Sequence, residues 1–188
     1  SRVQRSGAKF EEQRLDWVNG HFIRQKPLEA LYKMTEPFWP KEAKASNSDY
    51  KKTVLGLVQE RLKYLSELPD LTWFFFREPT DEEVKAQIAP KDWPKTSTGQ
   101  IRGNRADSTH LKATIESLRQ SDFSYDDIKS RLNDLLQSLN THPVVLFSEI
   151  RGATTGAKVS PELFGSLNVL GKDKVLARLQ RASQLLKA

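Results

Sequence analysis

The stretch from residue 48 to residue 70, SDYKKTVLGLVQERLKYLSELPD, constrains the fold more than any other part of the sequence. Its apolar side chains recur every three or four residues and are Val54, Val58, Leu62 and Leu65. This spacing places them on one face of an α-helix. Ser48 or Asp49 is suited to cap the start of the helix, and Pro69 is expected to end it. We therefore predict one long amphipathic helix that packs against a core.

Helical periodicity also dominates the rest of the chain, and Val144–Phe147 is the one run that resembles a strand. Further helices are expected near residues 11–18, 28–34, 80–88, 108–120, 125–139, 160–170 and 172–188. We predict an all-α fold with two packed helical subdomains. Residues 1–93 form the first, residues 94–107 are a flexible loop or insertion, and residues 108–188 form the second.

Local signals set several of the expected helix boundaries. The pairs Thr80 with Glu83 and Ser124 with Asp127 have the three-residue spacing of N-terminal capping patterns. Ser160 is expected to cap a helix that has Pro161 at its first position, and Gly171 to stop that helix in a left-handed conformation. Asn19-Gly20 is expected to end the first helix, with Leu15 and either Trp17 or Val18 packing before the break and Phe22 and Ile23 packing after it.

Composition and motifs argue against a self-contained enzyme. The chain has no cysteine, which excludes thiolate metal sites, and its three histidines lack the spacing of metal ligands. The segment GATTGAK at residues 152–158 lacks the spacing of a phosphate-binding loop, and no nucleophile-elbow motif is present. We predict no catalytic and no metal-binding residues. The net charge of +6 favours a polyanionic partner, because lysine and arginine contacts release counterions from phosphates.

Three segments carry a resemblance to a known family. Residues 10–24, FEEQRLDWVNGHFIR, contain a Leu-x-Trp-x-Asn-Gly-x-Phe-Ile-Arg core, and residues 57–76, LVQERLKYLSELPDLTWFFF, end in an aromatic block. Residues 161–182, PELFGSLNVLGKDKVLARLQRA, follow a Pro-x-Leu-Phe phrase with Leu-Gly-Lys and Val-Leu-x-Arg-Leu. In this order they resemble the C-terminal anticodon-binding region of bacterial-type and mitochondrial glutamyl-tRNA synthetases. Glu162 departs from the Gly usual there.

The resemblance implies a helical cage that recognises the anticodon loop of tRNA(Glu), and of tRNA(Gln) if the enzyme is non-discriminating. The two nucleotide-binding signatures of the family do not occur in this sequence. The chain is therefore expected to be inactive alone, with ATP and Mg²⁺ used by the full-length enzyme and its catalytic domain. The same resemblance implies a monomer without membrane contact, in the mitochondrial matrix or a bacterial cytoplasm, the matrix being preferred.

Arg61 is the residue expected to read the anticodon. In the family an arginine at the matching position of the long helix can recognise the third anticodon base. The planar donors of a guanidinium suit the carbonyl and N3 acceptors of cytosine, whereas guanine presents donors at this edge. The alternative is an ordinary arginine that faces solvent.

Weaker candidates follow from charge and stacking. Lys51, Lys52 and Lys63 are expected on the same helix as Arg61, where they can contact phosphates. Trp73 can stack on a base, although an aromatic residue in such a block is more often part of the core. Arg102 and Arg105 lie in the expected loop. The competing hypothesis for the whole chain is a helical protein-interaction scaffold that does not bind RNA.

Overall fold

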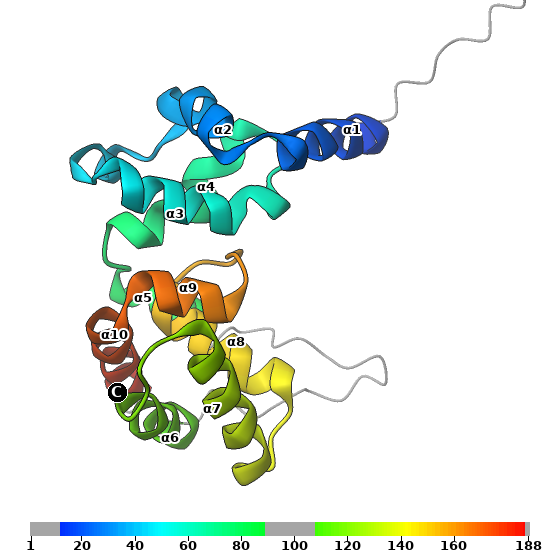
Figure 1. Cartoon of the computed structure of the whole chain (residues 1–188). Helices are drawn as coiled ribbons and strands as arrows, with labels where there is room; N and C mark the ends of the chain where they lie inside the picture. Colours follow the sequence, from blue (N-terminus) through cyan, green and yellow to red (C-terminus); the bar gives the residue numbers. More distant parts are fainter. Residues whose placement is uncertain (1–11, 89–107, 187–188) are drawn as a thin grey trace, which may run out of the picture.

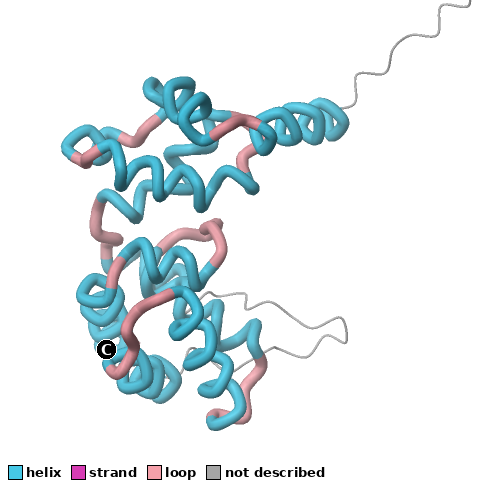
Figure 2. The backbone as a smooth tube through the Cα atoms, viewed as in Figure 1, coloured by secondary structure: helices cyan, strands magenta, loops and turns pink. Residues whose placement is uncertain are grey.

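The computed structural model describes residues 12–88 and 108–186, and within these ranges all regular secondary structure is helical, joined by loops and turns (Figures 1 and 2). The α-helices are α1 (Glu12–Gln25), α2 (Leu28–Thr35), α3 (Ser48–Val58), α4 (Leu68–Phe76), α5 (Asp81–Ile88), α6 (Ser108–Arg119), α7 (Tyr125–Ser138), α8 (Pro143–Thr155), α9 (Leu163–Leu170) and α10 (Lys172–Leu185). Four short 3₁₀ turns are η1 (Glu36–Phe38), η2 (Lys41–Ala45), η3 (Gln59–Arg61) and η4 (Leu65–Glu67). The predicted all-α class is confirmed. None of the described helices is long and apolar enough to cross a bilayer.

The helices form two clusters that lie one above the other in Figure 1, with α1–α4 in one and α5–α10 in the other. A small core that includes Leu31, Leu55 and Val58 holds the first cluster together. A larger core fills the second and continues into the first through Val54 and Phe74. Helix α3 therefore packs on both sides. Helix α5 packs against α8 and α10, while the boundary expected at residues 94–107 falls outside the described residues.

The predicted long helix is broken, which corrects the sequence expectation. Val54, Val58 and Leu62 are buried as predicted, but α3 ends at Val58. The Glu67 carboxylate accepts the backbone N–H groups of Lys63, at 2.8 Å, and Tyr64, at 3.1 Å, so these groups have partners without helical geometry. Pro69 lies in the first turn of α4 and does not end α3, because a proline in this position lacks only an N–H that would be unpaired there.

The aromatic block after this break forms α4, where Phe74 and Phe75 are almost fully buried.

The predicted helix caps are confirmed in two cases. Thr80 and Glu83 exchange hydrogen bonds of 2.8 and 3.2 Å, and the Ser124 hydroxyl accepts from the backbone N–H of Asp127 at 3.3 Å. Two other expectations are wrong by one or two residues. Asn47 caps α3, and Glu162 caps α9 by accepting from the N–H groups of Phe164 and Gly165. Gly171 ends α9 with φ of 84° and ψ of 156°, a positive-φ conformation outside the left-handed helical region.

Helix α1 does not end at Asn19-Gly20 but continues to Gln25. The reason is tertiary: the Asn19 side chain donates to the carbonyl of Lys63, and Gly20 is buried against this segment. A Cβ at Gly20 would lie 3.4 Å from the Leu62 carbonyl oxygen and 3.6 Å from the Lys63 Cα. The dipeptide expected to make a turn is therefore the point where α1 docks against the chain beyond η3.

Helix α8 was not predicted, because the β-branched residues at its start resemble a strand. Pro143 occupies its first turn, and Gly156, with φ of 60°, ends it in the left-handed region. The GATTGAK segment is thus the end of a helix and the turn that follows, consistent with the prediction that it is not a phosphate-binding loop.

Replacing Gly152 with alanine is expected to destabilise the fold. Its Cβ would lie 2.9 Å from the Cβ of Gln87 and 3.1 Å from the Gln87 backbone, so α5 and α8 would have to separate. We expect the free energy of unfolding to fall by about 1–3 kcal/mol in urea denaturation. Gly56→Ala is the matched control. Its Cβ would meet only Leu28 methyl groups at 3.9 and 4.0 Å, so a gain of up to about 1 kcal/mol in helix propensity is expected. Equal effects of the two substitutions would contradict this packing argument.

Candidate nucleic-acid interface

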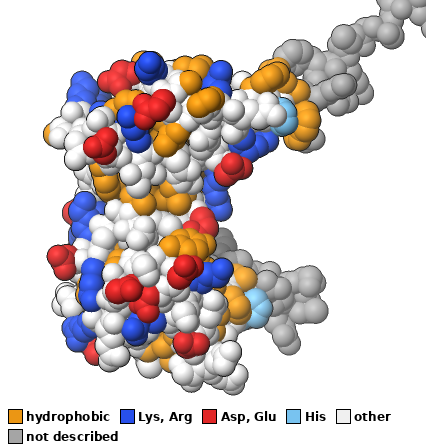
Figure 3. Space-filling view, in the orientation of Figure 1, with side chains coloured by type: hydrophobic (Ala, Val, Ile, Leu, Met, Phe, Trp, Pro, Cys, Tyr) orange, Lys and Arg blue, Asp and Glu red, His pale blue; other side chains and the backbone are white. Residues whose placement is uncertain are grey.

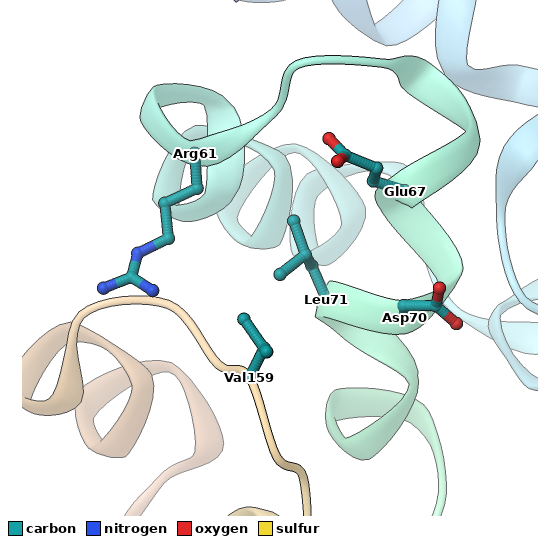
Figure 4. A pocket seen from close by; sticks show the side chains of 5 residues that line it. All are labelled: Arg61, Glu67, Asp70, Leu71 and Val159. Atoms are coloured by element: carbon teal, nitrogen blue, oxygen red, sulfur yellow. The ribbon is translucent and has the colours of Figure 1, made fainter. Parts of the chain in front are cut away.

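A cavity of about 370 Å³ lies where the two clusters meet, lined by Arg61, Glu67, Asp70, Leu71 and Val159. Figure 4 shows Arg61 extending from η3 towards the segment that carries Val159, with Leu71 and Val159 facing each other. The space-filling view shows the molecule hollowed between the two clusters (Figure 3). The cavity combines a cationic group and two carboxylates with apolar side chains.

The turn that carries Arg61 is held by helix α1. The side-chain amide of Gln59 donates to the carbonyls of Ile23, at 3.0 Å, and Lys26, at 2.8 Å. These contacts bring side-chain donors to the last turn of α1 and to the residue that follows it, where donors from within the helix are missing. The Tyr64 hydroxyl donates to Asp16 of α1 at 2.5 Å, and this hydrogen bond is the main cause of a lowered pKa of the Asp16 carboxyl. Helix α1 thus fixes both sides of the turn on which Arg61 lies.

The opposite wall of the cavity is the segment between α8 and α9. Arg151 of α8 is half-buried and its guanidinium donates to the Ser160 hydroxyl at 2.6 Å and to the Pro161 carbonyl at 2.7 Å. Burial lowers the pKa of Arg151, and the positive charge of Arg61 lowers it further. Two guanidinium groups therefore act on this region, one holding its wall and the other exposed in the cavity.

Arg61 and Lys63 are the sequence-predicted site residues that the structure brings close together, on either side of buried Leu62. Arg61 is exposed, and its guanidinium has no hydrogen bond or ion pair with any residue of 12–88 or 108–186. Lys63 Nζ lies 3.4 Å from the Asp16 carboxylate, and the lysine side chain stays 55% exposed.

The other predicted residues lie apart from this cavity. Lys51 is only 8% exposed, with its Nζ 5.9 Å from the centre of the Trp39 ring. Lys52 pairs with Glu29 of α2 at 2.7 Å. Trp73 is half-buried and the Arg77 guanidinium lies 3.8 Å from its ring centre, so one face of the ring is covered. Arg102 and Arg105 lie outside the described residues, and the roles of all five stay predictions.

Arg151 and Val159 were missed as site residues. Val159 lies in the four-residue segment AKVS between GATTG and the Pro-x-Leu-Phe phrase, whose length was the one usable sequence signal. Arg151 precedes GATTG, and no sequence motif marks it. What brings them opposite Arg61 is tertiary packing, which periodicity does not reveal. Elsewhere in the described ranges, no three His, Cys, Asp or Glu side chains converge to hold a metal ion.

Helix α1 carries an exposed apolar face, which corrects the expectation that its large side chains pack. Leu15, Trp17 and Phe22 are 45%, 64% and 59% exposed, and the His21 ring stacks on Trp17 with centres 5.4 Å apart. Figure 3 shows this hydrophobic group around a histidine where α1 projects from the first cluster. The opposite face of α1, which includes Gly20 and Ile23, contacts the body of the molecule.

Comparison with known proteins gives a family match over most of the chain. The family model described as "Anticodon binding domain" matches residues 30–183. Glutamate–tRNA ligase from Dehalococcoides mccartyi strain BAV1 is 31% identical over 186 residues, which is 96% of this chain and 36% of that protein. The enzyme of the same name from Roseiflexus castenholzii is 33% identical over 193 residues, which is 100% of this chain and 36% of that protein. The chain spans about a third of the length of these curated relatives.

Solved structures give the same fold. The crystal structure of a glutamate tRNA ligase from Elizabethkingia meningosepticum, in complex with its amino acid, aligns with a TM-score of 0.69 at 16% identity. The alignment covers 93% of this chain and 32% of that one. At this level of identity the likeness establishes the helical fold and nothing about individual contacts.

The ion pair of Arg77, the residue that covers Trp73, leads to a prediction about how the free energy of unfolding depends on pH. Arg77 is held by a two-pronged ion pair with Glu83, at 2.6 and 2.8 Å, which lowers the pKa of the Glu83 carboxyl from 4.5 to about 2. A carboxyl with a lowered folded pKa contributes stability above pH 4.5, and this contribution is lost as the pH falls towards 2. Glu83→Gln is expected to lower the free energy of unfolding at pH 7 by about 1 kcal/mol.

The difference between Glu83→Gln and the wild type should shrink in urea titrations repeated from pH 4.5 downwards. The control is Glu82→Gln, since Glu82 is exposed on the same helix and has the same charge. A Glu83 effect that stayed constant down to pH 2, or that matched the effect at Glu82, would contradict the assignment.

Proposed function

The chain belongs to the anticodon binding domain family, as it occurs in glutamate–tRNA ligases, and we propose that it recognises the anticodon loop of tRNA(Glu). In this proposal the cavity between η3, α4 and the Val159 segment receives one unstacked base. Sequence-specific recognition of RNA generally takes place on such splayed bases, in single-stranded loops. The cavity of about 370 Å³ falls within the range of roughly 300–1,000 Å³ typical of small-molecule sites.

The observation that carries the proposal is the exposed guanidinium of Arg61 at this cavity. An arginine engaged by a carboxylate would have its donors occupied, but no described acidic side chain pairs with Arg61. Its planar donors fit the O2 and N3 acceptors of cytosine, and they oppose the donors of guanine. Arg61 is accordingly proposed to read the third anticodon base.

The surroundings of Arg61 support binding of a base by stacking and charge. Leu71 and Val159 supply apolar surface on two sides of the cavity. The charge of Arg151 adds to that of Arg61, and a phosphate backbone would relieve the repulsion between them. Lys63 is proposed as a phosphate contact next to the base site, because its exposed ammonium adjoins the same turn.

The remaining predicted residues rank lower as RNA contacts. Lys52 would have to release Glu29, and Lys51 and Trp73 would have to leave Trp39 and Arg77. Arg102 and Arg105 remain predictions. Acceptance of tRNA(Gln) would require that guanine be tolerated at the Arg61 site.

We attribute the ATP-dependent ligase reaction, with its Mg²⁺, to the part of the relatives that this chain does not span. The partner in that reaction would be the enzyme's own catalytic domain, and a monomeric assembly and a mitochondrial or bacterial cytoplasmic location remain predictions. Both relatives named above come from bacteria, which favours the second location.

One observation favours a second function, that of a protein-interaction scaffold. The exposed face of Leu15, Trp17 and Phe22 on α1 is apolar and has no cover within the described ranges. Trp17→Ser would then reduce binding of a protein partner and leave RNA affinity unchanged, whereas Arg61→Ala would have the opposite pattern.

Arg61→Ala is the direct test of RNA recognition. We expect the affinity for a tRNA(Glu) anticodon stem-loop to fall about 5- to 150-fold, because one good base contact contributes roughly 1–3 kcal/mol. The preference for cytosine over guanine at the third anticodon base should fall with it. Both quantities are measured by fluorescence-anisotropy titration at low salt.

Arg119→Ala is the matched control, because this substitution also removes the positive charge of an exposed arginine. Arg119 lies on α6, away from the cavity, and pairs with Glu116 at 2.6 Å. If Arg61→Ala lowered the affinity but kept the preference for cytosine over guanine, the role of Arg61 would be reduced to a phosphate contact. Equal weakening by both substitutions would reject the proposed base site.

A further inference from the structure

Arg178 of α10 is a buried cation at the junction of the two clusters. Its side chain is 4% exposed, although α10 otherwise presents a polar face to solvent. Burying a guanidinium is unfavourable unless its donors are hydrogen-bonded and its charge is balanced. The contacts of Arg178 meet both conditions and join segments about a hundred residues apart.

Acceptors from two distant chain segments, residues 74–78 and Thr154, surround this guanidinium. Nη1 donates to the carbonyl of Thr154 at 2.7 Å, and Nη2 donates to the carbonyls of Phe74 at 3.0 Å and Arg77 at 3.2 Å. The Glu78 carboxylate accepts from Nε at 2.8 Å and from Nη2 at 3.0 Å. The ion pair with Arg178 is the main cause of a lowered pKa of the Glu78 carboxyl.

The carbonyl groups bound by Arg178 are those at the C-terminal ends of α4 and α8. Such groups have no partner within their own helix and carry the negative end of the helix dipole. One cation therefore stabilises two helix ends at once. Because the donors of a guanidinium are fixed in a plane, these bonds set the directions of both helices relative to each other.

These two helices carry the opposite walls of the candidate base site. Helix α4 contributes Asp70 and Leu71, about one turn before the Phe74 carbonyl. Helix α8 ends at Thr155, and the chain reaches Val159 four residues later. A rotation between α4 and α8 would therefore change the separation of Leu71 and Val159.

Other contacts across the junction are less directional. Leu57 of α3 lies over Gly165 of α9, where a Cβ would come within 2.6 Å of the Leu57 Cδ1. Apolar contacts of this kind stabilise association and tolerate small rotations. The hydrogen bonds of Arg178 do not tolerate them, since each loses strength steeply as its angle bends.

We propose that Arg178 is a positioning residue for base recognition: it fixes α4 and α8 at the spacing that lets Arg61, Leu71 and Val159 enclose one base. Its role in recognition rests on the proposed function, whereas its control of the spacing between the clusters stands independently. Arg178 itself does not touch the RNA.

The spacing is measured first, without RNA. The chain has no cysteine, so Lys33→Cys on α2 and Asn133→Cys on α7 provide exactly one exposed labelling site in each cluster. Nitroxide labels at these sites report a distance distribution by pulsed electron spin resonance. We expect one narrow maximum in the otherwise wild-type chain. Arg178→Lys should broaden the distribution and shift its maximum, because an ammonium cannot reach both helix ends and Glu78 together.

Arg181→Lys is the matched control. Arg181 lies one turn further along α10 and donates to Asp81 at 2.7 Å and to Pro79 at 2.8 Å, which ties α10 to the start of α5 only. Its substitution should leave the distance distribution unchanged. Circular dichroism and cooperative unfolding of each labelled chain ensure that folded molecules are compared.

The RNA measurement uses the unlabelled chain and anticodon stem-loops with cytosine or guanine at the third anticodon position. Arg178→Lys is expected to lower the cytosine preference at least about fivefold, as a displaced base contact should, while Arg181→Lys preserves it. A purely stabilising role would lower the melting temperature and leave this ratio unchanged at temperatures where the protein is folded.

Glu78→Gln keeps the test decisive if Arg178→Lys does not fold. Glu78 is 56% exposed. Its substitution removes the negative charge that pairs with Arg178, but the backbone carbonyls that accept from Arg178 remain. A smaller broadening is then expected. An unchanged distance distribution in every folded variant of this pair would overturn the proposal. Broadening with no base preference even in the wild type would reject the proposed function and leave the spacing role intact.

Discussion

The structure depends on satisfying the carbonyl groups at the ends of short helices. The α-helices have 8 to 14 residues, so a large share of their backbone lies in terminal turns whose carbonyls have no partner within the helix. Side chains from other segments supply donors there: Gln59 for the last turn of α1, Arg178 for α4 and α8, and Arg131 for the last turn of α6. Because each of these bonds links two segments, capping the helices also assembles the clusters.

This principle explains why the candidate base site lies on irregular backbone and is nevertheless well defined. Arg61 belongs to a 3₁₀ turn and Val159 to a connecting segment, which are elements that usually move more than helices. The first is fixed by Gln59 and α1, and the second by the hydrogen bonds of Arg151 to Ser160 and Pro161. Supporting contacts of this kind hold binding groups in a productive geometry.

Local signals made much of the fold predictable. The Thr80–Glu83 cap and the buried stripe of Val54, Val58 and Leu62 depend on spacing within one segment, and the structure confirms them. The break after Val58 was not predictable, because the backbone groups beyond it form hydrogen bonds with Glu67 and with α1. Hydrophobic periodicity does not reveal such partners. Burial of Lys51 against Trp39 likewise depends on a residue from another turn. The same holds for the candidate site. The family resemblance pointed to Arg61, but only tertiary packing places Arg151 and Val159 opposite it.

The docking of α1 has a chemical consequence for the Asn19-Gly20 dipeptide. In flexible chains an asparagine followed by glycine is prone to deamidation, because the glycine amide nitrogen can attack the side-chain carbonyl and close a succinimide ring. Here both residues are held in helical backbone, and the Asn19 amide donates to the Lys63 carbonyl. The attacking nitrogen is thus kept from its target. The contact between Asn19 and Lys63, which positions the turn of Arg61, therefore also protects Asn19 from deamidation.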